Sequence, residues 1–457
     1  MKHLLTLTLT ICIYITTIAQ TQLWVSTYYG GVDNRGQIFM GNIDGSDFQP
    51  VYNCDTNGSR ILGGFAVAPN GLFYGVTSTG GYHDSCVVFN YNPLTRVLTN
   101  IHDFVYEPDS GAGAASGLTL ASDGLLYGTA RAGGVYSDGV IFTVDPTTNN
   151  YHPVYHFDSI TGAQPQSTLL QLGDGKLYGT ATNGGNSNEG TLFKFNPVNN
   201  TLTTLYHFMQ STGAHPYFGK LIQAADGKLY GTTYDGGTYN NGVIYSFDLN
   251  TNTYTALFSF NDSLGKDCFS GLTEASDGLL YGMTNHGGLN HIGVLFSFNP
   301  VDSVYTLLLN LDTTTGAAPT RSLTQISTGK LFGATTAGGA QNTGTIFNYD
   351  VYTHTFTKVY DFADGAGHAS SEVTEAAINP ALSIDQAPVN HQTIIYPNPT
   401  SGALNIENIE PGTVLNIHNL LGQTVLTAVA ENRTVALNVS QLQPGMYFVN
   451  GAKFVKE

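Results

Sequence analysis

Short segments of alternating apolar and polar residues run along most of the chain, and they recur as a unit. One unit begins with the alternating segment 168–172, turns at Gly173-Asp174-Gly175 and continues as residues 176–181. A glycine-rich loop then leads to the apolar segment 191–195, and an Asn/Pro turn leads to residues 201–208. Alternation with a period of two, bounded by turn residues, indicates β-strands. Each unit therefore predicts four short antiparallel strands.

The unit occurs seven times, with a signature aromatic on its second strand and a Gly-Gly pair in the loop that follows; a glycine follows the aromatic in every unit but the first. The signature aromatics recur every 50–53 residues, at Trp24, Tyr74, Tyr127, Tyr178, Tyr230, Tyr281 and Phe332. Tandem four-stranded units without helical periodicity are typical of a β-propeller. We predict an all-β fold in which residues 20–380 form a seven-bladed β-propeller of four-stranded antiparallel blades.

The two ends of this array predict how the ring closes. The first unit lacks its first strand, whereas residues 371–378, after the seventh unit, have the pattern of that strand. We expect this segment to pair with the strand that contains Trp24, which leaves few free edges.

Aromatic residues share one phase on the third and fourth strands, which predicts a core between blades. Burial of each phenylalanine contributes about 1.5–3 kcal/mol. Cys54 and Leu311 replace phenylalanine in two units. The predicted core aromatics are Phe39, Phe89, Phe142, Phe193, Tyr245, Phe296 and Phe347 on the third strands and Phe104, Phe157, Phe208, Phe260 and Phe362 on the fourth.

The segments outside the array differ from it in pattern. Residues 1–19 combine Lys2 with an apolar run and small residues near Ala19, which predicts a secretory signal peptide. That run is short and interrupted by threonines, so we expect no transmembrane segment in the mature chain. A polar linker is predicted at 381–393, and residues 394–457 alternate between turn signals, which indicates a small C-terminal β-sandwich.

Charge and cysteine content restrict the partners and the setting. The formal net charge is −17, with 16 basic residues against 33 acidic ones. Nucleic acid is excluded as a partner because its phosphates require clustered Lys and Arg. Only Cys54, Cys86 and Cys268 follow the leader, so at most one disulfide could form. We expect an extracellular, monomeric protein.

The C-terminal segment also carries a set of motifs that belong together. They are Tyr396-Pro397-Asn398-Pro399-Thr400-Ser401-Gly402, Ile417-His418-Asn419-Leu420-Leu421-Gly422-Gln423, Leu442-Gln443-Pro444-Gly445-Met446-Tyr447 and Lys453-Phe454-Val455-Lys456. In these motifs residues 394–457 resemble the type A C-terminal sorting domain of cargo of the Bacteroidetes type IX secretion system. The resemblance implies that this machinery recognises residues 394–457. It also implies that the mature protein is secreted, either released or attached to the outer-membrane surface.

The repeats themselves resemble the GloVer tandem repeats of bacterial surface proteins that have assorted, choice-of-anchor C-termini. The resemblance rests on the Leu-Tyr-Gly-Thr and Gly-Gly motifs and on the strand of the type Gly242-Val243-Ile244-Tyr245. It supports the architecture and implies no particular activity or ligand.

Strand order places the Gly-Gly loops and the loops between blades on the same rim, where propellers bind ligands. We expect a surface binding or adhesion module for glycans or peptides, because aromatic and amide groups together suit sugar faces and hydroxyls. A rim without a defined small ligand is one alternative, and a polysaccharide-active lyase or hydrolase with a site in the central depression is another. The candidate ligand-binding residues are Arg60, Arg131, Asn183, His215, Tyr234, Asp235, Asp267, Asn285, His286 and Arg321.

Motifs for catalysis or cofactor binding are scarce. Asp123, Asp174, Asp226 and Asp277 each precede a glycine between the first two strands, and Asn70-Gly71 occupies the same place, so we assign them to tight turns. His286 and His291 share one loop and form the one candidate metal pair, while the acidic loop 361–364 is a candidate calcium ligand that no motif supports. Nucleophile-elbow, zinc-protease and phosphate-loop motifs are absent from the sequence. We therefore assign no catalytic residue and expect no cofactor.

Overall fold

The computed structural model consists of strands and turns, and no helix occurs among the residues that it describes. The chain divides into two compact units, Met1–Pro380 and Ala381–Glu457. The predicted signal peptide and the predicted linker lie outside the described residues. These are 20–83, 85–105, 110–114, 116–378, 394–396, 400–407, 413–419, 424–430, 432, 434–449 and 452–456.

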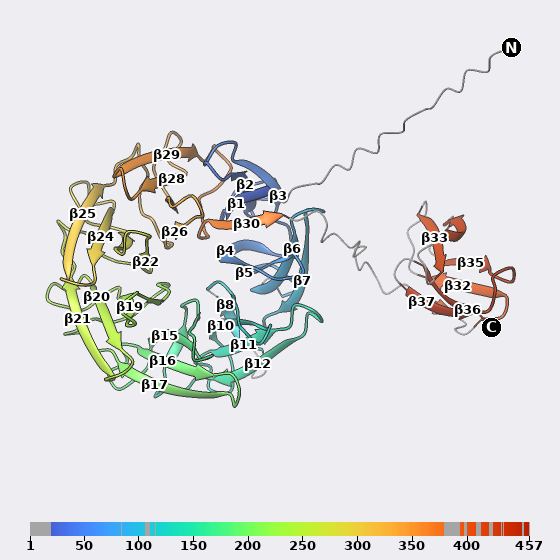
Figure 1. Ribbon diagram of the computed structural model, residues 1–457, viewed down its shortest axis with the longest axis horizontal. Coiled ribbons are helices and arrows are strands. Elements are labelled where there is room, and N and C mark those ends of the chain that lie inside the picture. The colour runs from blue at the N-terminus through green and yellow to red at the C-terminus, as the bar shows by residue number, and fades with distance from the viewer. Residues whose placement is uncertain are drawn as a thin grey trace, which may run out of the picture. The chain divides into compact units, whose positions relative to one another are not determined.

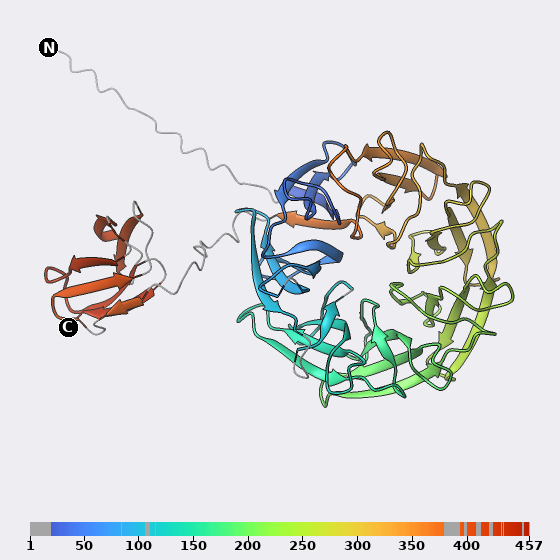
Figure 2. The same cartoon turned by 180° about the vertical axis from the view of Figure 1, so that it is seen from behind.

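Described residues of the first unit form seven antiparallel sheets arranged as blades around a ring (Figures 1 and 2). From the ring centre outward, blade 1 contains β30 (Thr374–Ile378), β1 (Gln20–Ser26), β2 (Gln37–Asn42) and β3 (Gln49–Asn53). Blade 2 contains β4 (Ser59–Val67), β5 (Phe73–Thr79), β6 (Val87–Asn92) and β7 (Val97–Asp103). Blades 5 to 7 contain β18 (Ile222–Gln223), β19 (Leu229–Thr232), β20 (Val243–Asp248) and β21 (Thr253–Ser259); β22 (Thr273–Glu274), β23 (Leu280–Thr284), β24 (Val294–Asn299) and β25 (Val304–Asn310); and β26 (Thr324–Gln325), β27 (Leu331–Ala334), β28 (Thr345–Asp350) and β29 (Thr355–Asp361).

Blades 3 and 4 differ in that their innermost strand is split into two short pieces. Blade 3 contains β8 (Ala112–Ala114), β9 (Thr119–Leu120), β10 (Leu126–Ala132), β11 (Val140–Val144) and β12 (Tyr151–His156), and blade 4 contains β13 (Ala163–Pro165), β14 (Leu170–Gln171), β15 (Leu177–Asn183), β16 (Thr191–Asn196) and β17 (Thr201–His207). Residues 163–165, in the connection between blades 3 and 4, pair with the end of β15. The loops between blades therefore continue the inner strands along the ring centre.

The ring closes as the sequence predicts. Strand β30 pairs with β1 in five residue pairs, and β30 is the innermost strand of blade 1 (Figure 1). The segment before β30 also holds blade 2, because the Ser370 hydroxyl donates to the Ile61 carbonyl at 2.6 Å. Beside it, the Phe65 backbone N–H donates to Thr374 Oγ1 at 3.1 Å. The segment from Ser370 to the end of β30 thus connects blades 1 and 2.

Aromatic packing between neighbouring blades supplies the core. All twelve predicted core aromatics are at most 1% exposed. Pairs of these residues from neighbouring blades meet edge-to-face: the ring centroid of Phe208, after β17 of blade 4, lies 5.3 Å from that of Tyr245 of blade 5. Cys54 and Leu311 are buried in their places. All three described cysteines are buried, and burial raises the pKa of Cys54 to about 12 and that of Cys268 to about 11.

The Asp-Gly turns are structural, as their sequence context predicts. Asp226 Oδ1 accepts the Lys228 backbone N–H at 3.1 Å, and its Oδ2 accepts the Tyr230 hydroxyl at 2.9 Å. In the seventh unit, Phe332 has no hydroxyl, and Thr328 stands at the aspartate position. The signature tyrosine and the turn residue therefore form one hydrogen-bonded pair. The corresponding pairs are Asp123 with Tyr127, Asp174 with Tyr178, Asp277 with Tyr281 and Asn70 with Tyr74.

The second unit contains two antiparallel sheets, as predicted. They share a core in which Leu404 of the first sheet and Ile417 and Phe454 of the second are buried. The first sheet is β31 (Ile394–Tyr396), β32 (Ala403–Glu407) and β35 (Thr434–Asn438), and the second is β34 (Thr424–Val429), β33 (Val414–Asn419), β36 (Gly445–Val449) and β37 (Ala452–Lys456).

Removal of β30 should open the ring. We expect a chain that ends after Gly367 to be less stable, by about 5 kcal/mol or more, than one that ends after Pro380, since each of several lost hydrogen bonds contributes about 1 kcal/mol. Thermal denaturation followed by circular dichroism measures the difference. The longer chain is the control because it lacks the second unit but keeps β30. Equal melting of the two chains would contradict the closure.

Candidate functional site

Each blade contributes one residue, at an equivalent position near its innermost strand, to the lining of the ring centre. A Cβ atom at Gly271 would lie 2.5 Å from the Lys220 carbonyl oxygen, so neighbouring backbones approach closely there. Glycine alone permits such an approach. The seven residues at this position, spaced by 50–53 residues, are Gly64, Gly117, Thr168, Lys220, Gly271, Ser322 and Glu372.

An ion pair crosses the ring centre. Lys220 Nζ lies 2.7 Å from Glu372 Oε2, with side chains 28% and 19% exposed. Lys220 belongs to blade 5 and Glu372 to blade 1, and two blades lie between them. Arg321 lies nearby, and its Nε donates to the Ser370 carbonyl at 2.9 Å. Burial lowers the pKa of Arg321 to about 10, and the Glu372 carboxylate partly offsets this, so the guanidinium stays protonated at neutral pH.

Four aromatic side chains gather beside this ion pair; we call Tyr217, Phe218, Tyr234 and Phe269 the aromatic platform. Their ring centroids lie 4.7–6.2 Å apart in the five contacts among them. The Arg321 guanidinium lies 4.8 Å from the centroid of Phe218. All four aromatics are partly exposed, and they lie outside the hydrophobic clusters between blades. The platform is therefore a surface feature of blades 5 and 6.

Local chain length and unused hydroxyls distinguish the platform. The chain advances five positions from His215 to Lys220, but only four from Asp267 to Gly271, so blade 5 has one residue more than blade 6 here. Neither the Tyr217 nor the Tyr234 hydroxyl hydrogen-bonds to a described residue. Burial, followed by the nearby Asp267 carboxylate, raises the pKa of Tyr234, which therefore remains a neutral donor.

Two His–Asp pairs flank the platform, and the two residue types exchange places between them: the loop before the inner strand carries the histidine in blade 5 and the aspartate in blade 6. His215 Nδ1 lies 2.8 Å from Asp235 Oδ2, and in the next blade His286 Nδ1 lies 2.9 Å from Asp267 Oδ2. His215 Nε2 also lies 3.4 Å from Glu189 Oε2. The hydrogen bond with Asp235 raises the pKa of His215, the Asp235 and Glu189 charges add to this, and burial opposes it. Each carboxylate here has an imidazole partner.

The other candidate residues lie in different surroundings. The Arg60 guanidinium lies 5.0 Å from the ring centroid of Tyr29 in blade 1. Arg131 is exposed, and Asn183 is half-buried at the end of β15. Asn285 is buried, and its amide donates to a backbone carbonyl. The ten predicted residues thus do not form one cluster, and their contact with a ligand stays a prediction.

Sequence reasoning missed several residues at the ring centre. Phe269 stands where two other units have Gln166 and Thr320, and this substitution was a usable signal. The Lys220–Glu372 pair gave no such signal, since the two residues are 152 positions apart. No described His, Cys, Asp or Glu residues form a group of three or more that could hold a metal ion.

Comparison with protein families identifies the repeats. The model of the Gloeobacter/Verrucomicrobia repeat matches residues 16–222 and 173–379. The chain belongs to this repeat family. A second model, the secretion system C-terminal sorting domain, matches residues 394–453 of this repeat protein. The type IX sorting domain marks the repeat protein as secreted and attached to the cell surface. The described residues contain no helix of the length and apolar character needed to span a membrane.

Comparison with solved structures supports the fold of the repeat protein. The Pseudomonas aeruginosa periplasmic gluconolactonase matches with a TM-score of 0.55 and 16% identity over 79% of this chain and 100% of its own. Putative 6-phosphogluconolactonases from Bacteroides uniformis and Bacteroides fragilis match with TM-scores of 0.53 and 0.52, at 13% and 16% identity, over 79% of this chain and 100% and 99% of theirs. At such identities the likeness shows the β-propeller fold alone. A comparison with curated proteins gave no match.

Breaking the central ion pair should destabilise the propeller, and the loss should depend on which of its two residues is replaced. We expect Glu372→Gln to cost about 1.5–3 kcal/mol, the range for hydrogen bonds to charged groups, and Lys220→Met to cost less, because Arg321 remains near Glu372. Urea denaturation measures both. Lys176→Met is the control, since the exposed Lys176–Asp174 pair should contribute less than about 1 kcal/mol. Equal, negligible losses in all three variants would contradict the role of the pair.

The His215–Asp235 contact should stabilise the protein mainly at low pH. Since the folded pKa of His215 is raised above 6.5, its contribution is complete below pH 6.5 and is lost as the pH rises through the folded pKa. His215→Gln with Asp235→Asn reproduces Gln164 and Asn183 of blade 4. We expect the free energies of unfolding of wild type and this variant to differ by about 1 kcal/mol or less at pH 6. Their melting temperatures, which measure this difference, should converge between pH 6 and pH 8. A pH-independent difference would contradict the assignment.

Proposed function

We propose that this secreted propeller is a surface module that binds glycans through the aromatic platform. The platform carries the proposal because it is a group of partly exposed aromatic rings at the ring centre. Small-ligand sites in proteins are typically lined by aromatic groups together with a few polar groups that fix orientation. The free hydroxyls of Tyr217 and Tyr234 and the guanidinium of Arg321 supply such polar groups beside apolar ring faces.

Pyranose rings fit this combination. A sugar presents a face of C–H groups that packs on an aromatic ring and a rim of hydroxyls that needs donors and acceptors. Tyrosine offers both an apolar ring and a polar tip. Export to the cell surface would expose the platform to extracellular glycans. Binding there would let the repeat protein act as an adhesion module.

Catalysis on a polysaccharide is the second candidate, and the two His–Asp pairs beside the platform are the observation that favours it. A carboxylate-oriented imidazole is a common general base. Each Asp is already engaged by its histidine, and the one further carboxylate described beside a pair, that of Glu189, lies against His215 Nε2 at 3.4 Å. For this reason we favour binding without turnover.

A glycan array with the purified chain from residue 20 onward tests the proposal. We expect at least one glycan to bind, and we expect Phe218→Ala and Phe269→Ala to weaken its affinity at least tenfold, or about 1.4 kcal/mol, through lost ring contacts. Tyr352→Ala is the control, because Tyr352 is an exposed aromatic on a hairpin at the opposite rim. Each bound glycan is then incubated with the protein and analysed for products.

Three outcomes are distinct. Binding that depends on the platform, without product, agrees with the proposal. Product formation would instead support the second candidate, catalysis on a polysaccharide. Binding only to peptides, or glycan binding unchanged in both phenylalanine variants, would overturn it.

A further inference from the structure

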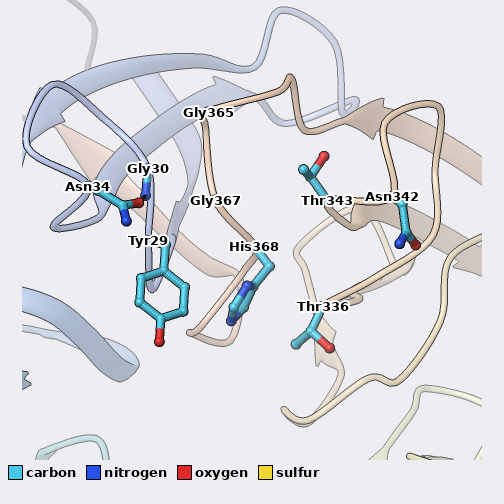
Figure 3. Close-up of a pocket in the computed structure, with 9 residues that line it drawn as sticks. All are labelled: Tyr29, Gly30, Asn34, Thr336, Asn342, Thr343, Gly365, Gly367 and His368. Carbon is cyan, nitrogen blue, oxygen red and sulfur yellow. Dashed lines mark hydrogen bonds between the residues drawn. The ribbon is translucent and has the colours of Figure 1, made fainter.

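A depression lies between blades 7 and 1, away from the aromatic platform, where the ring closes. Its volume is about 370 Å³, within the ~300–1,000 Å³ range of small-ligand sites. Figure 3 shows Tyr29 and His368 side by side, with Thr336 facing His368 across the open space. The side chains that line it include those of Tyr29, Asn34, Thr336, Asn342 and His368.

The closing loop has features that leave this space open. In blade 5, His215 holds the position that His368 holds in blade 1: each carbonyl accepts a backbone N–H, from Tyr234 and Tyr28 respectively. The His215 N–H also donates to the Glu189 carbonyl of the preceding blade, at 2.9 Å. Within the described residues, His368 N–H has no corresponding bond to blade 7. The loop from Phe362 to His368 is also one residue shorter than the loop from Phe208 to His215.

The polar groups around the depression are uncharged and only partly used. Asn34 Oδ1 accepts the Gly30 N–H at 2.8 Å, and Asn342 Oδ1 accepts the Gly338 N–H at 2.9 Å. Both amide NH₂ groups are left without a described partner. The Thr336 hydroxyl donates to a backbone carbonyl at 2.6 Å, so its oxygen still has accepting capacity. The lining therefore offers both hydrogen-bond donors and an acceptor.

One wall of the depression is aromatic. The ring centroids of Tyr29 and His368 lie 5.4 Å apart, and His368 also stacks on Tyr28 at 5.8 Å with an interplanar angle of 12°. Burial lowers the pKa of His368, so at neutral pH its imidazole is an uncharged donor and acceptor. The lining contains no carboxylate, ammonium or guanidinium group. The Arg60 guanidinium, 5.0 Å from the Tyr29 ring centroid, is not among the lining groups, so the lining itself offers no partner for a charged ligand.

We propose that this depression binds one neutral sugar residue, with Asn34, Asn342 and Thr336 engaging its hydroxyls and His368 and Tyr29 contacting its ring. The inference rests on the proposed glycan-binding function and extends it, since it names a second subsite and the charge of its ligand. A free amide, a hydroxyl and an aromatic wall are complementary to a pyranose that carries only hydroxyls.

Saturation-transfer NMR with a panel of neutral methyl glycosides and the corresponding uronic acids tests the proposal on the chain from residue 20 onward. We expect saturation of at least one neutral glycoside and no uronic acid. Thr336→Val keeps the shape but removes the hydroxyl, and His368→Phe keeps the ring but removes its nitrogens. Each should weaken binding about five- to tenfold, as expected for the loss of one hydrogen bond.

A matched control separates ligand contact from loop structure. Asn188 holds the same loop position in blade 4, where its Oδ1 accepts the Gly184 N–H at 3.0 Å. Asn342→Ala and Asn188→Ala therefore remove the same loop hydrogen bond, but only Asn342→Ala should weaken glycoside binding. Equal effects of the two variants, an unchanged signal in Thr336→Val and His368→Phe, preferential binding of a uronic acid or no binding at all would each overturn the subsite.

Failure of the subsite can be told apart from failure of the proposed function. Array binding that depends on Phe218 and Phe269 but not on Thr336 and His368 would retain the platform and remove the subsite. Glycoside binding that depends on Thr336 and His368 but not on Phe218 and Phe269 would retain the subsite and remove the platform.

Discussion

Pairing of β30 with β1 is the constraint on which the structure depends. Each blade buries its aromatic residues against the next blade, so a linear array would leave the faces at its two ends exposed to solvent. Closing the ring pairs those faces and removes two free sheet edges in one step. The closing segment goes further, because Ser370 and Thr374 also hydrogen-bond to backbone groups of blade 2. The ends of the array are therefore fixed to each other over two blades.

Most of this architecture could be predicted because each unit records its own geometry. A period of two, turn residues and repeated aromatics determine strands, hairpins and core within about 50 residues, and the unit is then repeated. The missing first strand and the spare segment 371–378 encode the closure in the same local terms. The split inner strands of blades 3 and 4 could not be predicted. Their first pieces, β8 and β13, consist of Ala, Gly, Gln and Pro and depend on pairing with the neighbouring strand rather than on their own pattern.

The candidate site was predicted less well, for a physical reason. The repeat pattern assigns each residue to a strand or loop of its own blade. The rim loops, and residues on them such as Tyr234 and Asp235, could therefore be located from the sequence. Contacts across the ring centre join blades that are not neighbours, and nothing within one unit indicates them. Lys220 with Glu372 and Arg321 with Phe218 are of this kind. The other three residues of the aromatic platform and the closing depression were missed because they arise where single units depart from the repeat.

Closure and the ligand face are therefore one structural event. The segment that closes the ring supplies Glu372 to the central ion pair, the Ser370 carbonyl to Arg321 and His368 to the depression. An open ring would remove the carboxylate opposite Lys220 and one wall of the depression together. By linkage, a ligand that binds only the closed ring must stabilise closure by an amount set by its affinity and concentration. The pairing of the chain ends thus determines both the stability of the propeller and the surface that it presents outside the cell.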